Sequence, residues 1–196
     1  MKTPTSMTSA TCRCGKVRLQ IIGEPILRSI CYCKSCQAAG RIHQAETDAD
    51  TVLAEDGGTD YVVYRKDKVR CVSGGDLLSE RRLKPDSPTR RMFTRCCNTA
   101  MFLDFTMGHW LTMYRARLPD DIPPATMRMM TAERPEGAAL PDDMTNYRGH
   151  SGKFVLKLLR AWIAMGFRRP GVEGVPSAGH ATAQAVLLDG SISPVD

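Results

Sequence analysis

The chain has 196 residues, of which 42% are hydrophobic and 24% are charged, and its formal net charge is +6. These proportions are ordinary for a globular protein, and the length fits one domain with an appendage. No apolar run approaches the roughly 20 residues that cross a bilayer, so we expect no membrane span.

The first 115 residues predict a series of short strands. From Lys16 to Ile22 the pattern alternates, with Val17, Leu19 and Ile21 on one face, which is typical of a half-buried strand. Short strands separated by turns favour a mainly β fold, an antiparallel sandwich or a pair of folded sheets. The further strands that we expect are residues 26–33, 61–65, 69–72, 90–95, 100–105 and 110–114.

The remaining residues follow a different pattern. Prolines interrupt residues 116–150, which we expect to form an irregular strap or a linker. Ser151 is a candidate N-cap for an amphipathic helix over residues 151–168. We expect its apolar face to pack on the β domain and its lysines and arginine to face water. The predicted divisions are a β domain at 10–115, the strap at 116–150, the helix at 151–168 and a tail at 169–196.

The positive charge is concentrated near the C-terminus. No acidic residue lies between Asp143 and Glu173, and six basic residues lie there: Arg148, Lys153, Lys157, Arg160, Arg168 and Arg169. We interpret this segment as the solvated face of a helix rather than as a nucleic-acid surface, because a nucleic-acid-binding domain usually carries its charge on the main fold. A nucleic-acid partner is therefore not expected.

Seven of the eight cysteines fall in three tight groups, Cys12–Cys14, Cys31–Cys36 and Cys96–Cys97. Such spacing lets short turns aim several sulfurs at one soft divalent metal, and we expect one or two Zn²⁺ ions per chain. Disulfides are the competing interpretation. The first ten residues are polar and show no secretory signal, so we expect a cytoplasmic protein with reduced thiols.

Cys31, Cys33 and Cys36 follow a predicted strand and form a Cys-x-Cys-x-x-Cys knuckle. Three protein ligands leave the fourth position of a tetrahedral zinc open, which a catalytic site requires. A thiol bound as thiolate is the natural fourth partner. The alternative is a structural zinc that a distant residue such as His43 completes.

Cys12 and Cys14 precede the first predicted strand, and Gly15 permits the tight turn of a metal knuckle. The adjacent candidates for completing this second site are Cys96 and Cys97. Cys71 stands alone in a predicted strand, and we expect it to be a small buried apolar residue.

Together these motifs resemble the glutathione-dependent formaldehyde-activating enzyme family, which shares its domain with the centromere protein V group and has an Mss4-like zinc fold. The resemblance covers roughly residues 10–115. The matching residues are Cys12, Cys14, Gly15, Val17, Arg18, Cys31, Cys33, Cys36, Gln37, Phe93 and Cys97.

The resemblance implies two zinc ions. One is structural and takes the Cys-x-Cys pair with a later Cys-x-x-Cys-Gly. The other takes the Cys31, Cys33 and Cys36 triplet, where the thiol of glutathione meets formaldehyde to form S-hydroxymethylglutathione.

The chain departs from the family pattern in one place. Alignment on Phe93 puts Thr94 at the first position of the later cysteine pair and Asn98 at the position of the glycine. The structural site is then either Cys12, Cys14, Cys96 and Cys97 or a weakened three-cysteine site. Both Cys96 and Cys97 can reach one metal only if the backbone turns there, and Asn98 tolerates the left-handed conformation of such a turn. The Cys-Cys pair points to a divergent branch of the family.

We therefore expect a carbon–sulfur lyase that forms or cleaves an adduct between a small thiol, such as glutathione, and a small aldehyde. Cys31, Cys33 and Cys36 are its candidate catalytic residues. The alternative is a non-catalytic zinc module that uses its basic helix to bind a partner. No histidine is a convincing general base, and we expect His43, His109, His150 and His180 to be structural or solvated.

Overall fold

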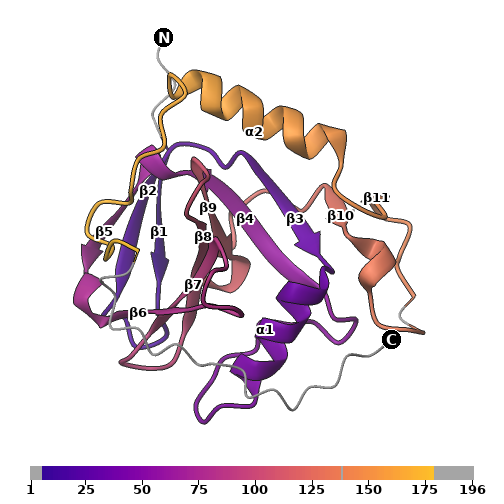
Figure 1. The fold of residues 1–196 in the computed structure, drawn as a ribbon, viewed down its shortest axis with the longest axis horizontal. Helices are drawn as coiled ribbons and strands as arrows, with labels where there is room; N and C mark the ends of the chain where they lie inside the picture. The colour runs from indigo at the N-terminus through magenta and orange to yellow at the C-terminus, as the bar shows by residue number, and fades with distance from the viewer. Residues whose placement is uncertain (1–5, 138, 179–196) are drawn as a thin grey trace.

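The computed structural model of the protein describes residues 6–137 and 139–178. Within them the strands form two sheets (Figure 1). The smaller sheet has the order β1 (Met7–Thr11), β2 (Arg18–Ile22) and β5 (Val69–Ser73). The larger sheet has the order β11 (Thr145–Asn146), β10 (Met127–Met129), β3 (Leu27–Cys31), β4 (Thr59–Arg65), β9 (Trp110–Tyr114), β8 (Ala100–Phe105), β7 (Thr89–Thr94) and β6 (Leu78–Arg81).

Antiparallel pairing predominates, and the prediction of a mainly β fold is confirmed. The exception is the β10 edge, because β10 pairs in parallel with both β3 and β11. The strands β1, β6, β10 and β11 were not predicted, while the seven expected strands are present with boundaries shifted by up to two residues.

The main core lies between the two sheets. Val17, Leu19 and Ile21 are completely buried, as the alternation predicted. They pack in one cluster with side chains of the larger sheet, among them Val62, Tyr64, Met92, Phe102, Leu111 and Met113. Since side chains alternate along a strand, the neighbouring residues of β4, β8 and β9 face the opposite side of this sheet.

Two helices lie beside the larger sheet, and Figure 1 shows α2 running along one end of it. The first, α1 (Lys34–Gln44), directly follows the knuckle cysteines and was not predicted. The second is α2 (Gly152–Ala164), whose N-cap is Ser151 as expected: the Ser151 Oγ accepts a hydrogen bond from the Phe154 N–H at 3.0 Å.

The packing of α2 agrees with the prediction only in part. Leu158 and Ala161 are buried, and Lys153 and Arg160 are exposed. Val155, Leu159 and Ile163, which the sequence assigned to the packed face, are instead 56%, 43% and 54% exposed. Phe154 and Leu158 pack with Leu27 of β3 and Val63 of β4, so only a narrow stripe of the apolar surface of α2 is covered.

The segment after residue 115 adds to the sheets. β10 and β11 come from the proline-rich residues 116–150 and extend the larger sheet at its β3 edge. Glu173 bridges to Arg70 of β5, so the chain beyond α2 lies against the smaller sheet. The predicted division into a β domain, strap, helix and tail stays a prediction, and residues 179–196 of that tail lie outside the described residues. None of the described helices has the length and apolar character that crossing a membrane requires.

Candidate metal centres and an adjoining cleft

The first cysteine cluster brings together Cys12, Cys14, Cys96 and Cys97, the full set that the sequence proposed. Their sulfurs all lie within 4.8 Å of one another. The Sγ–Sγ distances are 3.6 Å from Cys12 to Cys14, 3.4 Å from Cys14 to Cys96 and 3.7 Å from Cys96 to Cys97. Four sulfurs bound at about 2.3 Å to a tetrahedral zinc lie about 3.8 Å apart, so this cluster fits the ion.

Two turns produce this arrangement. Cys12 and Cys14 lie in the hairpin between β1 and β2, where Gly15 has a φ of 76° and the Val17 N–H donates to the Cys12 Sγ at 3.3 Å. Cys96 and Cys97 follow β7 in a turn that Asn98 closes with a φ of 44°. The left-handed residue is the one that the sequence analysis singled out, and the turn lets two adjacent cysteines face one point.

Thr94 takes a supporting position in the first cluster. Its hydroxyl lies 3.4 Å from the Cys97 Sγ, and the Thr99 hydroxyl lies 3.1 Å from the same sulfur. Partial burial opposes ionisation of Cys97, but the bonds from Thr94 and Thr99 outweigh it and lower the pKa of this thiol to about 6. Cys96, not Thr94, brings the fourth sulfur to this cluster, and Thr94 is a hydrogen-bond partner of Cys97.

The second cluster contains Cys31, Cys33 and Cys36, whose sulfurs also lie within 4.8 Å of one another. Cys31 ends β3, Cys33 is the N-cap of α1, and Cys36 lies in the first turn of that helix. The Cys36 N–H points at the Cys33 Sγ at 3.4 Å. A strand end followed at once by a helix N-terminus thus gathers the three thiols, and the donor set suits zinc with one position left open.

The local field favours one thiolate in this cluster. Hydrogen bonds from the Cys31 and Cys36 thiols hold the pKa of Cys33 far below its usual value, and the bond to Cys33 raises the pKa of Cys31 correspondingly. The N-terminus of α1 adds a partial positive charge beside Cys33. The site is therefore prepared to carry negative charge on sulfur.

Sequence reasoning missed two side chains beside the second cluster, Tyr61 and Arg91. The Tyr61 hydroxyl donates to the Cys36 Sγ at 3.5 Å. The centroid of the Tyr61 ring lies 5.2 Å from that of the Tyr114 ring. Burial raises the pKa of Tyr61 well above its usual value, so its hydroxyl stays protonated. Arg91 is only 3% exposed. Alternation along β4 could have indicated Tyr61, but its distance from Cys36 depends on the unpredicted helix α1.

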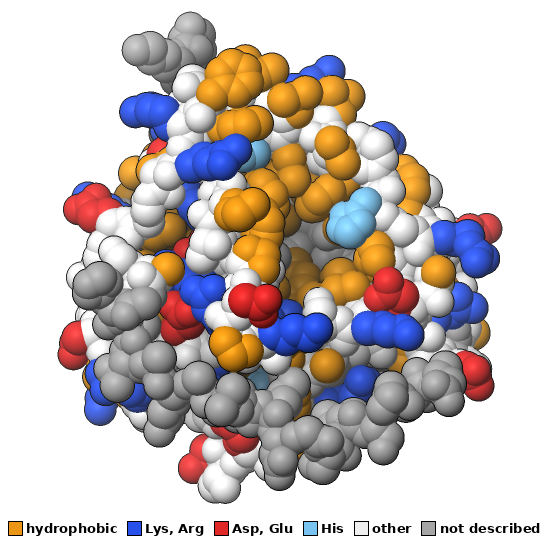
Figure 2. All heavy atoms as spheres, in the orientation of Figure 1, with side chains coloured by type: hydrophobic (Ala, Val, Ile, Leu, Met, Phe, Trp, Pro, Cys, Tyr) orange, Lys and Arg blue, Asp and Glu red, His pale blue; other side chains and the backbone are white. Residues whose placement is uncertain are grey.

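A cleft of about 430 Å³ adjoins this cluster, and Cys31, Cys33 and Cys36 form part of its lining. Its floor is the outer face of the larger sheet, and α2 contributes a wall through Phe154 and Leu158. Figure 2 shows a hollow on this face, below α2, in which hydrophobic side chains predominate. The first cluster does not line this cleft.

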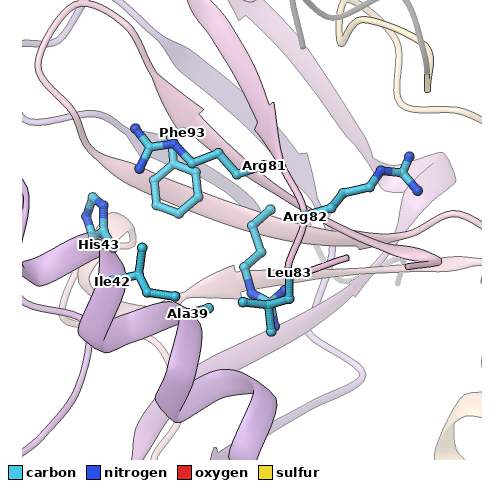
Figure 3. Close-up of a pocket in the computed structure, with 8 residues that line it drawn as sticks. Ala39, Ile42, His43, Arg81, Arg82, Leu83 and Phe93 are labelled. Carbon is cyan, nitrogen blue, oxygen red and sulfur yellow. The ribbon is translucent and has the colours of Figure 1, made fainter. Parts of the chain in front are cut away.

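A second and much smaller pocket lies between α1 and the β6–β7 edge (Figure 3). Ala39, Ile42 and His43 face Arg81 and Phe93 across it. Its volume of about 30 Å³ has room for about two water molecules, so it is not a substrate site.

The described histidines are accounted for without a catalytic role. His43 is buried, its Nε2 lies 2.7 Å from Asp50 Oδ1, and it is not among the residues whose ligand atoms gather in either cysteine cluster. His109 is buried against the Leu158 carbonyl at 2.8 Å. His150 is exposed and lies in the lining of the cleft, and His180 is outside the described residues.

Cys71 is half-buried in β5, less enclosed than expected.

These features define a mainly β protein with two cysteine clusters that can each hold a metal ion. The chain matches the model of the glutathione-dependent formaldehyde-activating enzyme family over residues 7–126, and it belongs to this family. A solved structure of a Rhodobacter sphaeroides protein is similar at a TM-score of 0.41 and 17% identity, covering 59% of this chain and 91% of that one. A comparison with curated proteins gives no match.

Proposed function

We propose that this protein is a carbon–sulfur lyase that forms or cleaves an adduct between a thiol such as glutathione and an aldehyde. The observation that carries the proposal is the three-thiol cluster in the lining of the cleft, in a chain of the formaldehyde-activating family. The proposal includes a structural zinc at Cys12, Cys14, Cys96 and Cys97, a second zinc at Cys31, Cys33 and Cys36, an Mss4-like fold and a cytoplasmic location.

The second cluster differs from the first in a way that supports catalysis. Cys12, Cys14, Cys96 and Cys97 supply four ligands, which closes a tetrahedral site, whereas the second cluster supplies three. A zinc ion bound there would offer its fourth position to the substrate thiol and hold it as a thiolate at neutral pH.

In the reaction that we propose, the thiolate sulfur attacks the carbonyl carbon. The S–C bond forms, the π bond of the carbonyl opens, and the oxygen takes up a proton. Tyr61 lies beside Cys36 in the cleft lining, and its hydroxyl can donate to that oxygen when the proton turns from the Cys36 Sγ toward the substrate. Arg91 supplies the nearby positive charge that stabilises the developing oxyanion.

A test compares Cys33→Ser with Cys71→Ser, a cysteine that belongs to neither cluster. Cys33→Ser should lose about one zinc per chain and abolish both glutathione binding and acceleration of adduct formation. Metal content is measured by elemental analysis and the exchange of glutathione with its hydroxymethyl adduct by NMR. Unchanged zinc content in Cys33→Ser would remove the metal assignment, and Cys71→Ser should behave as wild type.

A second candidate function is a non-catalytic module that binds a partner through α2. The apolar side chains that α2 leaves exposed favour it, since Val155, Leu156, Leu159 and Ile163 are each more than two-fifths exposed. The NMR exchange experiment separates the two functions. A zinc-loaded protein that does not accelerate exchange for any thiol–aldehyde pair would support the non-catalytic module.

A further inference from the structure

Resting on the proposed function, we propose that the aldehyde this protein takes carries an apolar group of about the size of a phenyl ring, rather than being formaldehyde. The inference concerns the carbon part of the substrate, which the cleft must accommodate beside the thiol cluster. Three independent features of the cleft lead to it.

The first feature is the size and chemistry of the cleft. Side chains alternate along the strands that form its floor, so every second residue points away from the buried core and into the cleft. These residues are Tyr61, Val63, Leu103, Phe105, Trp110 and Thr112. Neither formaldehyde, with its single carbon, nor the polar peptide of glutathione supplies an apolar group to cover the mainly apolar lining of this cleft of roughly 430 Å³. Clefts with mainly apolar linings of this size bind ligands by burying apolar surface.

The second feature is the wall that α2 adds. Phe154 and Leu158 line the cleft and pack beside Leu27, Val63 and Trp110. The matched family region ends at residue 126, so these wall residues, with Met129 and His150, come from the part of the chain beyond it. The apolar wall therefore comes from outside the region that matches the family model, and a single-carbon substrate does not need it.

The third feature is the distribution of charge. Among the described residues that line the cleft there is no Asp or Glu, and the basic ones are Arg91 and His150. Arg91 is almost fully buried, and its Nε has no hydrogen-bond partner among the described residues. The Arg91 guanidinium donates from Nη2 to the Ser35 carbonyl at 3.2 Å, next to the thiol cluster, so its positive charge lies near the carbonyl oxygen that becomes the adduct hydroxyl. The absence of acidic groups disfavours a cationic substrate.

The bonding change is the same as for formaldehyde. The thiol sulfur forms one bond to the carbonyl carbon, the carbonyl π bond breaks, and the proton released from the thiol ends on the oxygen. The product is a hemithioacetal, and no oxidant or reductant is consumed. The reverse reaction releases the free aldehyde and thiol.

The kinetic test compares formaldehyde with phenylacetaldehyde, using glutathione and the zinc-loaded full-length protein. We expect kcat/KM to favour phenylacetaldehyde at least tenfold, after correction for hydration of each aldehyde. Phe154→Ala should lower that ratio at least fivefold because it removes the aromatic wall. Val155→Ala, on the next residue of α2 but 56% exposed, is the matched control and should leave the ratio unchanged.

A binding measurement separates this inference from the proposed activity. By calorimetry, S-benzylglutathione should bind at least tenfold more tightly than S-methylglutathione, and Phe154→Ala should remove the difference. If formaldehyde reacts but the benzyl group gives no advantage in rate or binding, the inference is overturned and the activity stands. If neither aldehyde reacts but the benzyl preference persists, the activity fails and the apolar cleft remains. If neither aldehyde reacts and the benzyl preference is also absent, the proposed activity and the inference about the aldehyde are both overturned.

Discussion

Asp50 joins three separate parts of the chain through one buried carboxylate. Its Oδ1 lies 2.7 Å from His43 Nε2 of α1 and accepts a hydrogen bond from the Ala100 N–H at 3.0 Å. Its Oδ2 lies 3.0 Å from Arg117. His43 also packs against the Phe93 ring at 4.6 Å, so the carboxylate fixes α1 against β7 and β8. This helix carries Cys36, so Asp50 indirectly positions the second cluster.

Asp50→Asn should lower the free energy of unfolding by about 3 kcal/mol, because the variant leaves the buried guanidinium of Arg117 without its counter-charge. The matched control is Asp67→Asn, which breaks the part-exposed pair with Arg65 and should cost less than about 1 kcal/mol. Urea denaturation of both variants at pH 7 measures the difference. Equal effects would mean that Asp50 contributes no more than a surface ion pair.

The pH dependence of this contribution follows from the direction of the shift. Burial opposes ionisation of Asp50, but the bonds from His43 and Ala100 and the charge of Arg117 lower its pKa below the ordinary 3.8. A lowered pKa gives stability that is complete above 3.8 and is lost as the pH falls toward the folded-state value. The advantage of wild type over Asp50→Asn should therefore be constant near neutral pH and shrink below about pH 4.

At the scale of single residues, the features that the sequence predicted correctly are those that depend on local chemistry alone. The cysteine groups, the turn at Asn98 and the cap at Ser151 all follow from residue type and spacing within a few positions. Tyr61 and Arg91 could not be predicted as neighbours of Cys36. Their position depends on strand register and on α1, which are set by contacts far apart in the chain.

At the level of elements, the first cluster connects the two sheets. Cys12 and Cys14 lie between β1 and β2 of the smaller sheet, and Cys96 and Cys97 lie between β7 and β8 of the larger one. A metal ion held by all four closes a loop of more than eighty residues, judged from the separation of Cys14 and Cys96. Binding free energy at such a site is folding free energy.

Cys97→Ala should therefore lower the free energy of unfolding by about 3 kcal/mol or more, which for a chain of this size lowers Tm by roughly 6–12 °C. Cys71→Ala, a half-buried cysteine outside both clusters, should cost about 1 kcal/mol or less. Thermal melts of both zinc-loaded variants give the comparison. Coincident melting curves would show that the first cluster holds no structural metal.

The elements that the sequence did not predict share a physical reason. α1 buries Gln37, Gly40 and His43 instead of a clear apolar stripe, because it packs through hydrogen bonds and close contacts. β1 lacks apolar alternation, and β10 is a three-residue strand held between two neighbours. For these segments the pairing partner supplies the structure, and local propensity does not reveal it.

In the whole molecule, the C-terminal part of the chain packs in two places: on the outer face of the larger sheet and in the core between the two sheets. Leu158 covers Leu27 and Val63 on the outer face of the larger sheet. Further along, Val172 is 6% exposed and belongs to the core between the sheets, and the Cys71 N–H donates to the Glu173 carbonyl at 2.7 Å. The sequence predicted a docked helix, but it did not predict that the following residues complete the core.

A chain that ends at Gly149 should therefore be markedly less stable than the full-length protein, although it keeps both cysteine clusters and every strand named above. It loses the cover over Leu27 and Val63 and leaves the position of Val172 empty, so apolar surface becomes exposed to water. We expect a lower Tm, increased binding of the dye ANS and reduced solubility, with zinc content measured in parallel. A truncated protein that melts with the full-length chain, binds no more dye and keeps its solubility would show that the segment is a detachable arm. In that case the apolar side chains exposed on α2 would be its functional surface.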